Sequence, residues 1–459
     1  MASPSLTSLL ILSTLVSIPC PGELTATNVF PANGADHVCP DASLRLSFNA
    51  PVVLGDTGKI TIYHSADHRQ VDCIDLADKK PTNNVGGKTL RYDPIQITGN
   101  AVSIQLHFRA LQSGESYEVE IDPGVFKSTG GKFAVVKNNG EWKFSVRAAL
   151  PAGRTNLIVA ADGSGDFCTL QGAVDYVPDD NQSPIEIFVR KGEYPGLTYI
   201  AAQKGRVHIV GEDRKGTIIS GRNNDRLNSG RIGRALFSVD ANDFVLENVT
   251  LHNTTPYGGS QAEALAVKGE HCVLRNDDFY SFQDTLLLTG RVYVTNCHVE
   301  GDVDFIWGQG SVFFDRCELK AVHKGYYLQA RNPAGQPGYV FFQCKLTATP
   351  GVARCVLARI DADRFPSSQA VFIDCQMGSQ IPPIGWDVKG TNLSHLGFCE
   401  YHSTDLQGKQ LDPRQRHPAS RQLTEAEARE LSDPAKVLSY QQLWIPAGAQ
   451  ISHRNAQNR

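Results

Sequence analysis

Two acidic residues stand among apolar ones in the stretch from Ser281 to Gly310. Asp284 lies in the sequence QDTL, and Asp304 lies twenty residues later in DFIWG. Two carboxylates held close together cannot both ionise at low cost, so one of them keeps its proton near neutral pH. A neutral acid beside a charged carboxylate is a pair that hydrolytic enzymes use. These residue types therefore predict hydrolysis, provided that the fold brings the two side chains together.

A repeat in the middle of the chain offers a way to bring them together. Six segments share a short apolar run, a polar residue and then a small or acidic residue: FVLENVTL, CVLRNDDF, VYVTNCHV, VFFDRCEL, VFFQCKL and VFIDCQM. Aligned on the residue after the polar one, they fall at intervals of 28, 20, 20, 27 and 31 residues, at Val249, Asp277, Cys297, Cys317, Cys344 and Cys375. A unit of about twenty residues with longer inserted loops is typical of a solenoid. We predict a right-handed parallel β-helix.

The two acids occupy the same place in this repeat. Asp284 lies thirteen residues before Cys297, and Asp304 lies thirteen before Cys317. Residues at one register of a β-helix stack, so the carboxylates are expected on one face of adjacent coils, about 4.8 Å apart. Two solvated surface acids are the alternative. The matched register and the neighbouring Trp307 favour a site.

Two glutamines fall near the same register. Gln261, in QAEAL, lies sixteen residues before Asp277, and Gln283 directly precedes Asp284. An amide side chain can donate a hydrogen bond to a developing oxyanion without adding charge. Gln261 and Gln283 are therefore candidates for holding a tetrahedral intermediate.

Two arginines also precede register positions of the repeat, Arg331 by thirteen residues and Arg359 by sixteen. A guanidinium beside Asp304 would keep that carboxylate ionised, which makes Asp304 the nucleophile and leaves Asp284 protonated. Either arginine could instead be an ordinary surface residue, and the spacing alone does not choose between them.

The composition excludes several classes of protein. Of 459 residues, 41% are hydrophobic and 20% are charged, and the net charge is −4. These values are ordinary for a globular protein, and without a basic field we expect no nucleic-acid partner. None of the thirteen histidines shows H-E-x-x-H or H-x-H spacing. We therefore expect neither a metal nor another cofactor.

The length and a change of pattern predict two domains. Residues 21–149 contain short alternating runs that are typical of an immunoglobulin-like (Ig-like) β-sandwich. A Pro/Gly break at 151–153 precedes residues 154–447, the expected β-helix. Residues 1–20 hold an uncharged apolar run too short for a confident membrane span, and we predict a signal peptide, with a buried strand as the alternative. We expect a secreted, periplasmic or cell-surface monomer without a membrane span.

Eleven cysteines leave at least one thiol outside any intramolecular pair. Four of them share the repeat register, which predicts a ladder of buried thiols acting as small apolar groups. Disulfides between neighbouring coils are the alternative. Cys39 and Cys73, both in the first domain, could pair, and the sequence does not decide.

The second domain resembles the pectin methylesterases, carbohydrate esterases built on the pectin-lyase-like β-helix. The similarity rests on IVAADGSGDFCTLQGAVDYVP, RKGEYPGL, QAEAL, SFQDTLL, GDVDFIWGQGSVFFDRC, VLAR, GWD and EYHSTD, in the family's order. The first domain, through FPANGADHVCPDASLRLSFNAPV and EWKFSVRA, resembles bacterial Ig-like modules.

The resemblance implies a role for each matching residue. Asp304 would attack the ester carbonyl of methyl-esterified pectin (polygalacturonate) to form an acyl-enzyme and release methanol. Asp284 would act as the acid and then as the base, and Gln261 and Gln283 would hold the oxyanion. Arg359 matches the arginine of the family's LGRPW motif, which orients the nucleophile, and Arg331 is the alternative.

The chain departs from that motif, because Ile360 and Asp361 replace its Pro-Trp pair. The missing tryptophan lines the sugar cleft in the family, and Phe365 or Trp307 could replace it. The predicted substrate-binding residues are Trp307, Phe305, Arg331 and Trp386, with a core position as the alternative for Trp386.

Two other functions stay open at this point. The altered motif also fits a catalytically inactive, carbohydrate-binding β-helix, against which stand both aspartates and both glutamines. The same apparatus would also serve an esterase that acts on another acylated polysaccharide. A lyase or polygalacturonase on this fold would need a calcium-binding acidic cluster or a different set of aspartates, and the sequence has neither.

Overall fold

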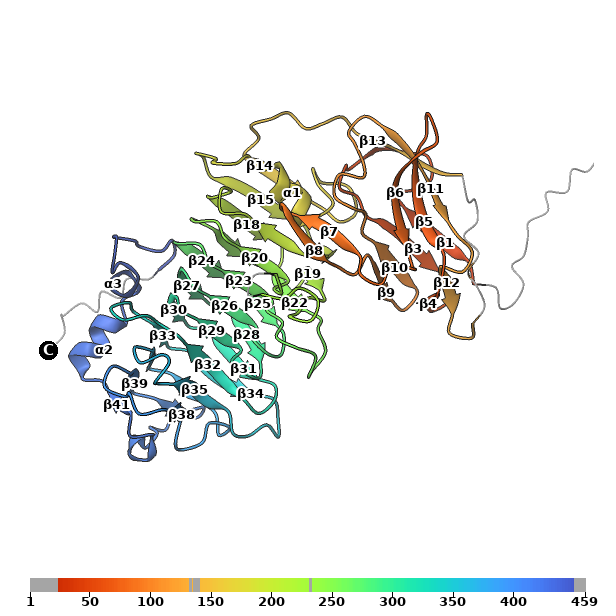
Figure 1. Cartoon of the computed structure of the whole chain (residues 1–459). Helices are drawn as coiled ribbons and strands as arrows, with labels where there is room; N and C mark the ends of the chain where they lie inside the picture. Colours follow the sequence, from red (N-terminus) through yellow and green to blue (C-terminus); the bar gives the residue numbers. More distant parts are fainter. Residues whose placement is uncertain (1–23, 132–133, 135–140, 231–232, 450–459) are drawn as a thin grey trace, which may run out of the picture.

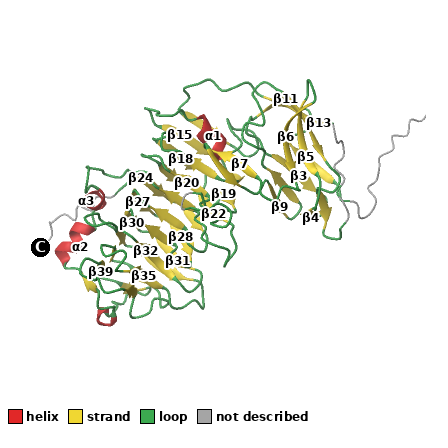
Figure 2. Ribbon diagram, viewed as in Figure 1, coloured by secondary structure: helices red, strands yellow, loops and turns green. Residues whose placement is uncertain are grey.

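The computed structural model describes residues 24–131, 134, 141–230 and 233–449. A β-sandwich, red to orange in Figure 1, lies at one end of a long stack of strands that runs from yellow to blue. Figure 2 shows how little helix the molecule contains. The predicted fold class, an Ig-like sandwich followed by a parallel β-helix, is confirmed. The predicted signal peptide, residues 1–20, lies outside the described residues.

The sandwich has two main sheets that enclose a core of alternating apolar side chains such as Leu44, Leu46 and Phe48. The first sheet is β1 (Ala26–Phe30), β3 (Leu44–Phe48), β10 (Ala101–Ile104) and β9 (Ile95–Thr98). The second is β2 (Ala35–Val38), β13 (Trp142–Val146), β11 (Ser116–Ile121), β5 (Lys59–His64) and β6 (Arg69–Asp75). Two smaller pairs are β4 (Val52–Leu54) with β12 (Phe126–Ser128), and β7 (Thr82–Val85) with β8 (Lys88–Arg91).

The β-helix has three sheets, in which each coil pairs in parallel with the next. The eleven-stranded sheet is β14 (Asn156–Val159), β15 (Ile185–Val189), β18 (Val207–Gly211), β21 (Val245–Glu247), β24 (Cys272–Arg275), β27 (Arg291–Thr295), β30 (Ser311–Asp315), β33 (Tyr339–Phe342), β36 (Gln369–Ile373), β39 (Gly397–Tyr401) and β41 (Ser420–Gln422). The nine-stranded sheet is β16 (Gly192–Pro195), β19 (Thr217–Gly221), β22 (Thr250–Asn253), β25 (Asp278–Tyr280), β28 (His298–Gly301), β31 (Glu318–Ala321), β34 (Lys345–Ala348), β37 (Gln376–Met377) and β40 (Thr404–Asp405). The eight-stranded sheet is β17 (Thr198–Ile200), β20 (Phe237–Val239), β23 (Leu265–Val267), β26 (Leu286–Leu288), β29 (Ile306–Gly308), β32 (Tyr326–Ala330), β35 (Val356–Asp361) and β38 (Trp386–Lys389).

The register read from the sequence is the register of the coils. The residue after each aligned position donates its backbone N–H to the aligned residue of the coil before: Glu318 to Cys297, Lys345 to Cys317 and Gln376 to Cys344, each at 2.9 Å. The polar residue before each aligned position has a positive φ, for example 54° at Asn296. Asparagine adopts this conformation more readily than most residues, which explains why the turn leaves a polar mark in the sequence.

Four cysteines form the predicted ladder. Cys297, Cys317, Cys344 and Cys375 are buried and carry free thiols. Each sulfur lies within hydrogen-bonding distance of one or two backbone carbonyls, as Cys317 does with Val294 and Asp315 at 3.5 Å. Cys39 and Cys73 are also free, and Cys39 lies beside Cys168 of the other domain rather than beside Cys73. The pairing of Cys39 with Cys73, which the sequence left open, is not formed in this structure.

Short helices pack on the first coils and on one outer face of the β-helix. α1 (Leu170–Tyr176) starts at the N-cap Thr169 and packs Leu170, Ala173 and Val174 onto the first coils. At the other end, α2 (Glu425–Leu431) and α3 (Pro434–Leu438) cover the outer face of the eleven-stranded sheet. A 3-10 turn, Pro413–Gln415, precedes them. Among the described residues, no helix has the length and apolar character that a bilayer crossing requires.

The two domains touch through polar and apolar contacts. The hairpin of β7 and β8 packs Val85 against Tyr199 and Leu236, beside the eight-stranded sheet. Arg222 of the β-helix holds both oxygens of Asp93 at 2.8 Å. A hollow of about 1450 Å³ lies between the domains, and its lining includes none of the predicted catalytic residues.

Candidate active site

A row of three carboxylates crosses the eight-stranded sheet at the start of its strands β23, β26 and β29 (Figure 1). Leu265 pairs with Leu286 and Leu286 pairs with Ile306, so the residues two positions earlier are neighbours in the stack. These residues are Glu263, Asp284 and Asp304. The structure therefore places the two aspartates on adjacent coils, as their spacing predicts, and adds a third acid one coil earlier.

Both aspartates lie in a turn that aims the side chain away from the core. Their φ angles are 67° for Asp284 and 50° for Asp304. The backbone N–H of Asp284 donates to the carbonyl of Val303 at 3.1 Å, which ties the two turns together. The two residues are only 7% and 4% exposed, so neighbouring groups control their ionisation.

The guanidinium group of Arg359 binds the carboxylate of Asp304. Nε of Arg359, from β35, lies 2.8 Å from its Oδ1 and 3.0 Å from its Oδ2, and Nη2 of Arg359 also donates to Oδ2. Nε2 of Gln329, from β32, donates to Oδ2 at 3.0 Å. Burial raises the pKa of Asp304 above its usual value, and the hydrogen bonds and charge of Arg359 offset part of this rise. These contacts favour the ionised form of Asp304.

Arg331 hydrogen-bonds to Gln329, and its charge lowers the pKa of Asp304, which burial raises. Nε of Arg331 donates to Oε1 of Gln329 at 2.7 Å, and this turns the amide nitrogen of Gln329 toward Asp304. Of the two arginines named as candidates, Arg359 thus makes the direct contact. Gln329 was not predicted, because it lies in β32 with no motif around it.

Asp284 has a different set of neighbours. Nη2 of Arg234 donates to its Oδ2 at 2.7 Å, and Arg234 also grips Glu263 through Nε and Nη2. Burial is the largest cause that raises the pKa of Asp284, followed by the charge of Glu263, and its pKa lies well above the usual range. Asp304 raises it further, whereas Arg234 and Arg331 lower it. The balance favours a protonated Asp284.

Arg234 and Glu263 were missed by the sequence reasoning. Glu263 lies fourteen residues before Asp277, within one residue of the spacing that identified the aspartates, so the repeat carried a signal for it. Arg234 lies in the connection before β20, outside the repeat, and no spacing marks it.

The two glutamines lie beside the carboxylates on consecutive coils. The N–H of Ala262, next to Gln261, donates to the carbonyl of Gln283 at 3.1 Å. Both glutamines are partly exposed, and Oε1 of Gln261 accepts from Ser260 at 3.1 Å. Both amide groups thus lie at the solvent side of the row.

Two of the predicted substrate-binding residues are core residues. Phe305 is fully buried and packs on Tyr327, with ring centroids 5.1 Å apart. Trp386 is 1% exposed and stacks on Phe398 inside the β-helix. The prediction that Phe305 and Trp386 bind substrate is therefore wrong, because neither ring reaches the surface.

Trp307 lies outside the main core, in a small buried cluster, and is 3% exposed because arginines cover its ring. The guanidinium of Arg331 lies 4.8 Å from its ring centroid, and that of Arg234 lies 5.3 Å from it. Arg331 also lies 5.5 Å from the ring of the partly exposed Phe365, in the segment that departs from the family's motif. Trp307, Arg331 and Phe365 therefore form one layer of rings and charge beside the carboxylates.

A second group of rings was not predicted. Tyr257 is 62% exposed, stacks on His323 at 3.9 Å and meets the edge of Phe282 at 5.6 Å. Phe282 immediately precedes Gln283, so these rings stand at the edge of the site. We call Tyr257, Phe282 and His323 the aromatic rim. Its residues come from three separate coils, which explains why no short motif reveals it.

Comparison with known proteins relates each of the two domains to a family. Residues 156–437 match the family model described as pectinesterase, and residues 22–146 match that of a bacterial Ig-like domain. Pectinesterase 2 of Olea europaea is 30% identical over 353 residues, covering 74% of this chain and 90% of the relative, and Pectinesterase 31 of Arabidopsis thaliana is 29% identical, covering 59% and 88%. The solved pectin methylesterase from carrot shares the fold, with a TM-score of 0.57 and 24% identity over 64% of this chain and 95% of that one. The chain belongs to the pectinesterase family, and a bacterial Ig-like domain precedes its β-helix.

Proposed function

We propose that this pectinesterase hydrolyses the methyl esters of galacturonate residues in pectin through an acyl-enzyme on Asp304. A single observation carries the mechanism: two buried aspartates stand at one register of adjacent coils, and only Asp304 has a direct, two-pronged contact with the guanidinium of Arg359. That asymmetry favours a charged nucleophile beside a neutral acid.

The proposed steps balance in atoms and charge. The carboxylate of Asp304 attacks the ester carbonyl carbon, and the amides of Gln261 and Gln283 donate to the oxyanion that forms. Asp284 gives its proton to the methoxy oxygen, the C–O bond breaks, and methanol leaves. Asp284, now charged, takes a proton from water while the water oxygen attacks the acyl carbon. Asp304 leaves as a carboxylate, and Asp284 is protonated again.

The surroundings of the carboxylates fit an anionic sugar chain. Arg331 offers a guanidinium beside Trp307 and Phe365, and this layer would contact the sugar faces and the free carboxylates of pectin. The exposed ring of Tyr257 in the aromatic rim would stack on a sugar on the other side. The partly exposed Phe365 takes the place of the tryptophan that the family's motif supplies, and the buried Trp307 supports Arg331 from beneath.

The decisive experiment measures methanol released from highly esterified pectin and, in parallel, acetate released from acetylated xylan. We expect methanol release by the intact chain and loss of at least about a thousandfold in turnover for Asp304→Ala and for Asp284→Ala. Glu186→Ala, at an exposed acid far along the stack, serves as the matched control and keeps full activity. Near-normal turnover in either aspartate variant would refute the assigned roles.

The same assay separates the competing functions. A carbohydrate-binding β-helix without activity would retain pectin in a pull-down and release no methanol. An esterase of another acylated polysaccharide would release acetate from xylan faster than methanol from pectin.

We further propose the following organisation for the chain: a signal peptide at residues 1–20, an Ig-like module at 21–149 and a catalytic β-helix at 154–447, acting as a monomer outside the cytoplasm. Sequencing the N-terminus of the exported protein tests the first part, because a mature chain that still begins at Met1 would contradict it. Light scattering of the purified protein tests the monomer.

A further inference from the structure

Arg234 and Glu263 form an ion pair directly behind Asp284. Nε of Arg234 lies 2.9 Å from both carboxylate oxygens of Glu263, and Nη2 lies 2.7 Å from Oε1. The same Nη2 lies 2.7 Å from Oδ2 of Asp284. Glu263 is fully buried and Arg234 is 8% exposed. One guanidinium therefore bridges two buried carboxyl groups.

A lone guanidinium at this distance would work against the proposed chemistry. A positive charge beside a carboxyl group favours the ionised form, and an ionised Asp284 has no proton to give to the leaving methoxy oxygen. The second carboxylate changes this balance. Because Glu263 is bound to Arg234 through two nitrogens, the pair brings almost no net charge to Asp284.

We propose that Glu263 and Arg234 act as a neutral positioning pair for the acid of the reaction. Arg234 donates to Oδ2 of Asp284 and so holds the carboxyl group in one orientation, with Oδ1 left to carry the proton. Glu263 cancels the charge of Arg234, so that the hydrogen bond orients Asp284 without ionising it. This inference rests on the proposed function, because it assumes that Asp284 is the acid.

The groups that face Asp284 agree with this role. Glu263 and Asp304 raise its pKa, whereas Arg234 and Arg331 lower it. Arg234 has a further, weaker partner in Asp225 at 3.3 Å. Burial raises the pKa of Glu263, and the hydrogen bonds and charge of Arg234, with a hydrogen bond from Trp307, offset part of this rise. Two negative charges, those of Glu263 and Asp304, favour a protonated Asp284. Of these, only the charge of Glu263 can be removed without changing a proposed catalytic residue.

The test is the pH profile of methanol release by Glu263→Gln in the full chain. Activity that needs a protonated Asp284 falls as the pH rises through the pKa of Asp284, so this group sets the basic limb. Glutamine keeps the shape of Glu263 but leaves Arg234 uncompensated, which lowers that pKa. We expect the basic limb of kcat to move down by about 1–2 pH units. An unchanged basic limb in the folded variant would overturn the proposal.

A double variant separates charge from fold. Arg234→Gln with Glu263→Gln removes both charges, so the basic limb is expected to return to within about half a unit of wild type while kcat stays low for lack of orientation. A basic limb that stays shifted would also overturn the proposal. If Asp284→Ala keeps its activity, the proposed function itself fails. If Asp284→Ala is inactive and Glu263→Gln is unshifted, only the neutral pair fails.

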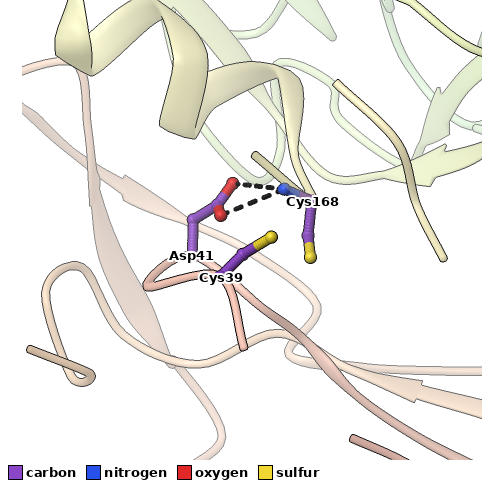
Figure 3. Close-up of side chains that lie close together, drawn as sticks. All are labelled: Cys39, Asp41 and Cys168. Atoms are coloured by element: carbon purple, nitrogen blue, oxygen red, sulfur yellow. Dashed lines mark hydrogen bonds between the residues drawn. The ribbon is translucent and has the colours of Figure 1, made fainter. Parts of the chain in front are cut away.

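An independent observation concerns the junction of the two domains. Cys39 and Asp41 of the first domain meet Cys168 of the second, and the two sulfur atoms lie side by side (Figure 3). The two sulfurs and a carboxylate oxygen of Asp41 all lie within 4.8 Å of one another. Cys39 and Cys168 are 0% and 5% exposed. The two thiols are 129 residues apart in the chain and lie in one buried cluster, to which the second domain contributes Cys168.

The contacts of Asp41 argue against a metal here. Its Oδ1 accepts from the N–H of Cys168 at 3.0 Å, and its Oδ2 accepts from the N–H and hydroxyl of Thr169 at 2.7 Å each. Both oxygens are thus occupied with protein donors at the start of α1. Two thiols without a free third ligand fall short of a tetrahedral zinc site.

The cysteine ladder provides the contrast. Ladder thiols lie at one register in the turns between strands of successive coils, and each is near the backbone carbonyl two residues before it. Cys39 lies near the carbonyls of Gly163 and Gly165 at 3.8 and 3.9 Å, and in addition it receives a hydrogen bond from Nη2 of Arg147 at 3.2 Å. Hydrogen bonding with Cys168 and with Arg147 lowers the pKa of Cys39, so its thiolate is favoured as the attacking group.

We infer that Cys39 and Cys168 form a disulfide that ties the Ig-like module to the β-helix. The Cys39 thiolate attacks a disulfide of the oxidant, which is a thiol–disulfide oxidoreductase or a small disulfide such as oxidised glutathione. The Cys168 thiolate then attacks the Cys39 sulfur and releases the oxidant as thiols. The two cysteines lose two protons and two electrons, which the disulfide of the oxidant gains. Such oxidants are present in the compartments that an exported protein reaches.

The full chain, purified and equilibrated in a glutathione redox buffer, provides the test. After unfolding without reductant and alkylation, we expect a peptide pair linked through Cys39 and Cys168 and lighter by two hydrogen atoms, while the ladder cysteines are alkylated. A reductant should lower the Tm of the wild type by several degrees but leave that of Cys168→Ala unchanged. Cys73→Ala is the control and should behave like wild type. Alkylation of both Cys39 and Cys168, or zinc bound stoichiometrically with both thiols reduced, would overturn the inference.

Discussion

Replacing Arg359 by alanine is expected to slow methanol release by a factor that can be worked from its contacts. Two donor groups of Arg359, Nε and Nη2, bind the carboxylate of Asp304. The side chain of Asp304 is 6% exposed and that of Arg359 is 36% exposed, so water replaces part of what is lost. A charge-assisted hydrogen bond contributes about 1.5–3 kcal/mol, and two of them, reduced for solvent access, amount to about 2–4 kcal/mol. This corresponds to a loss of about 30- to 900-fold in kcat/KM.

The pH profile gives the sign of the effect. Arg359 lowers the pKa of Asp304, which burial raises. Without Arg359 that pKa rises, so a larger share of Asp304 is protonated at neutral pH and cannot attack. The acid limb of the profile should therefore move to higher pH, and part of the lost activity should return as the pH rises.

The measurement is methanol release from esterified pectin across the pH range for Arg359→Ala, Arg359→Lys and Arg331→Ala. Lysine keeps the positive charge but lacks the planar pair of donors of arginine, so the activity of Arg359→Lys should lie between those of the wild type and Arg359→Ala. Arg331→Ala should lose about tenfold or less, because Arg359 still donates its hydrogen bonds to Asp304 in that variant. A larger loss in Arg331→Ala than in Arg359→Ala, or an unmoved acid limb in Arg359→Ala, would refute this reasoning.

Three further predictions address substrate binding and stability. Phe365→Ala should raise KM for pectin several-fold with little change in kcat, and an unchanged KM would remove Phe365 from the sugar contacts. Cys317→Ala should lower the free energy of unfolding in urea by about 1–2 kcal/mol, since it opens a small cavity in the ladder; equal midpoints would contradict this. His298 and Lys320 lower the pKa of Glu300 to about 2, so this carboxylate stabilises the fold above its ordinary pKa and loses that effect as the pH falls toward 2. Glu300→Gln should thus have a lower Tm than wild type at pH 6 and an equal Tm near pH 2, and a Tm difference that persists at acid pH would refute the assignment.

The coil register could be predicted because its cause is local. Each coil ends a strand in a turn residue with positive φ, as Asn276, Asn296 and Arg316 do, and the next residue is aligned with its counterpart in the following coil. Such turns favour a few polar residue types, so they leave a mark at each repeat. Counting from that mark placed Asp284 and Asp304 on adjacent coils without any three-dimensional information.

The failures share a different cause. Arg234 reaches the site from a connection between coils, and the lengths of these connections vary, so no period relates it to Asp284. Phe305 is next to Asp304 in sequence, yet it belongs to the buried core, as Ile306 does, and the two-residue alternation of an extended chain does not predict this directly after a turn. The approach of Cys39 to Cys168 depends on how two domains pack. Sequence distance carries no information about such a contact.

The stack of coils creates the electrostatic problem that the site then uses. Alignment of the coils brings Glu263, Asp284 and Asp304 together whatever their charges, and three buried anions in a row would be costly. Two arginines from outside the row pair with these acids unequally. Arg359 forms an ion pair with Asp304, whereas Arg234 forms ion pairs with both Glu263 and Asp284. Asp284, the middle acid of the row, is therefore the one of the three whose ionisation costs the most free energy. The position of a residue in the stack, together with the side from which each arginine approaches, determines which acid keeps the proton.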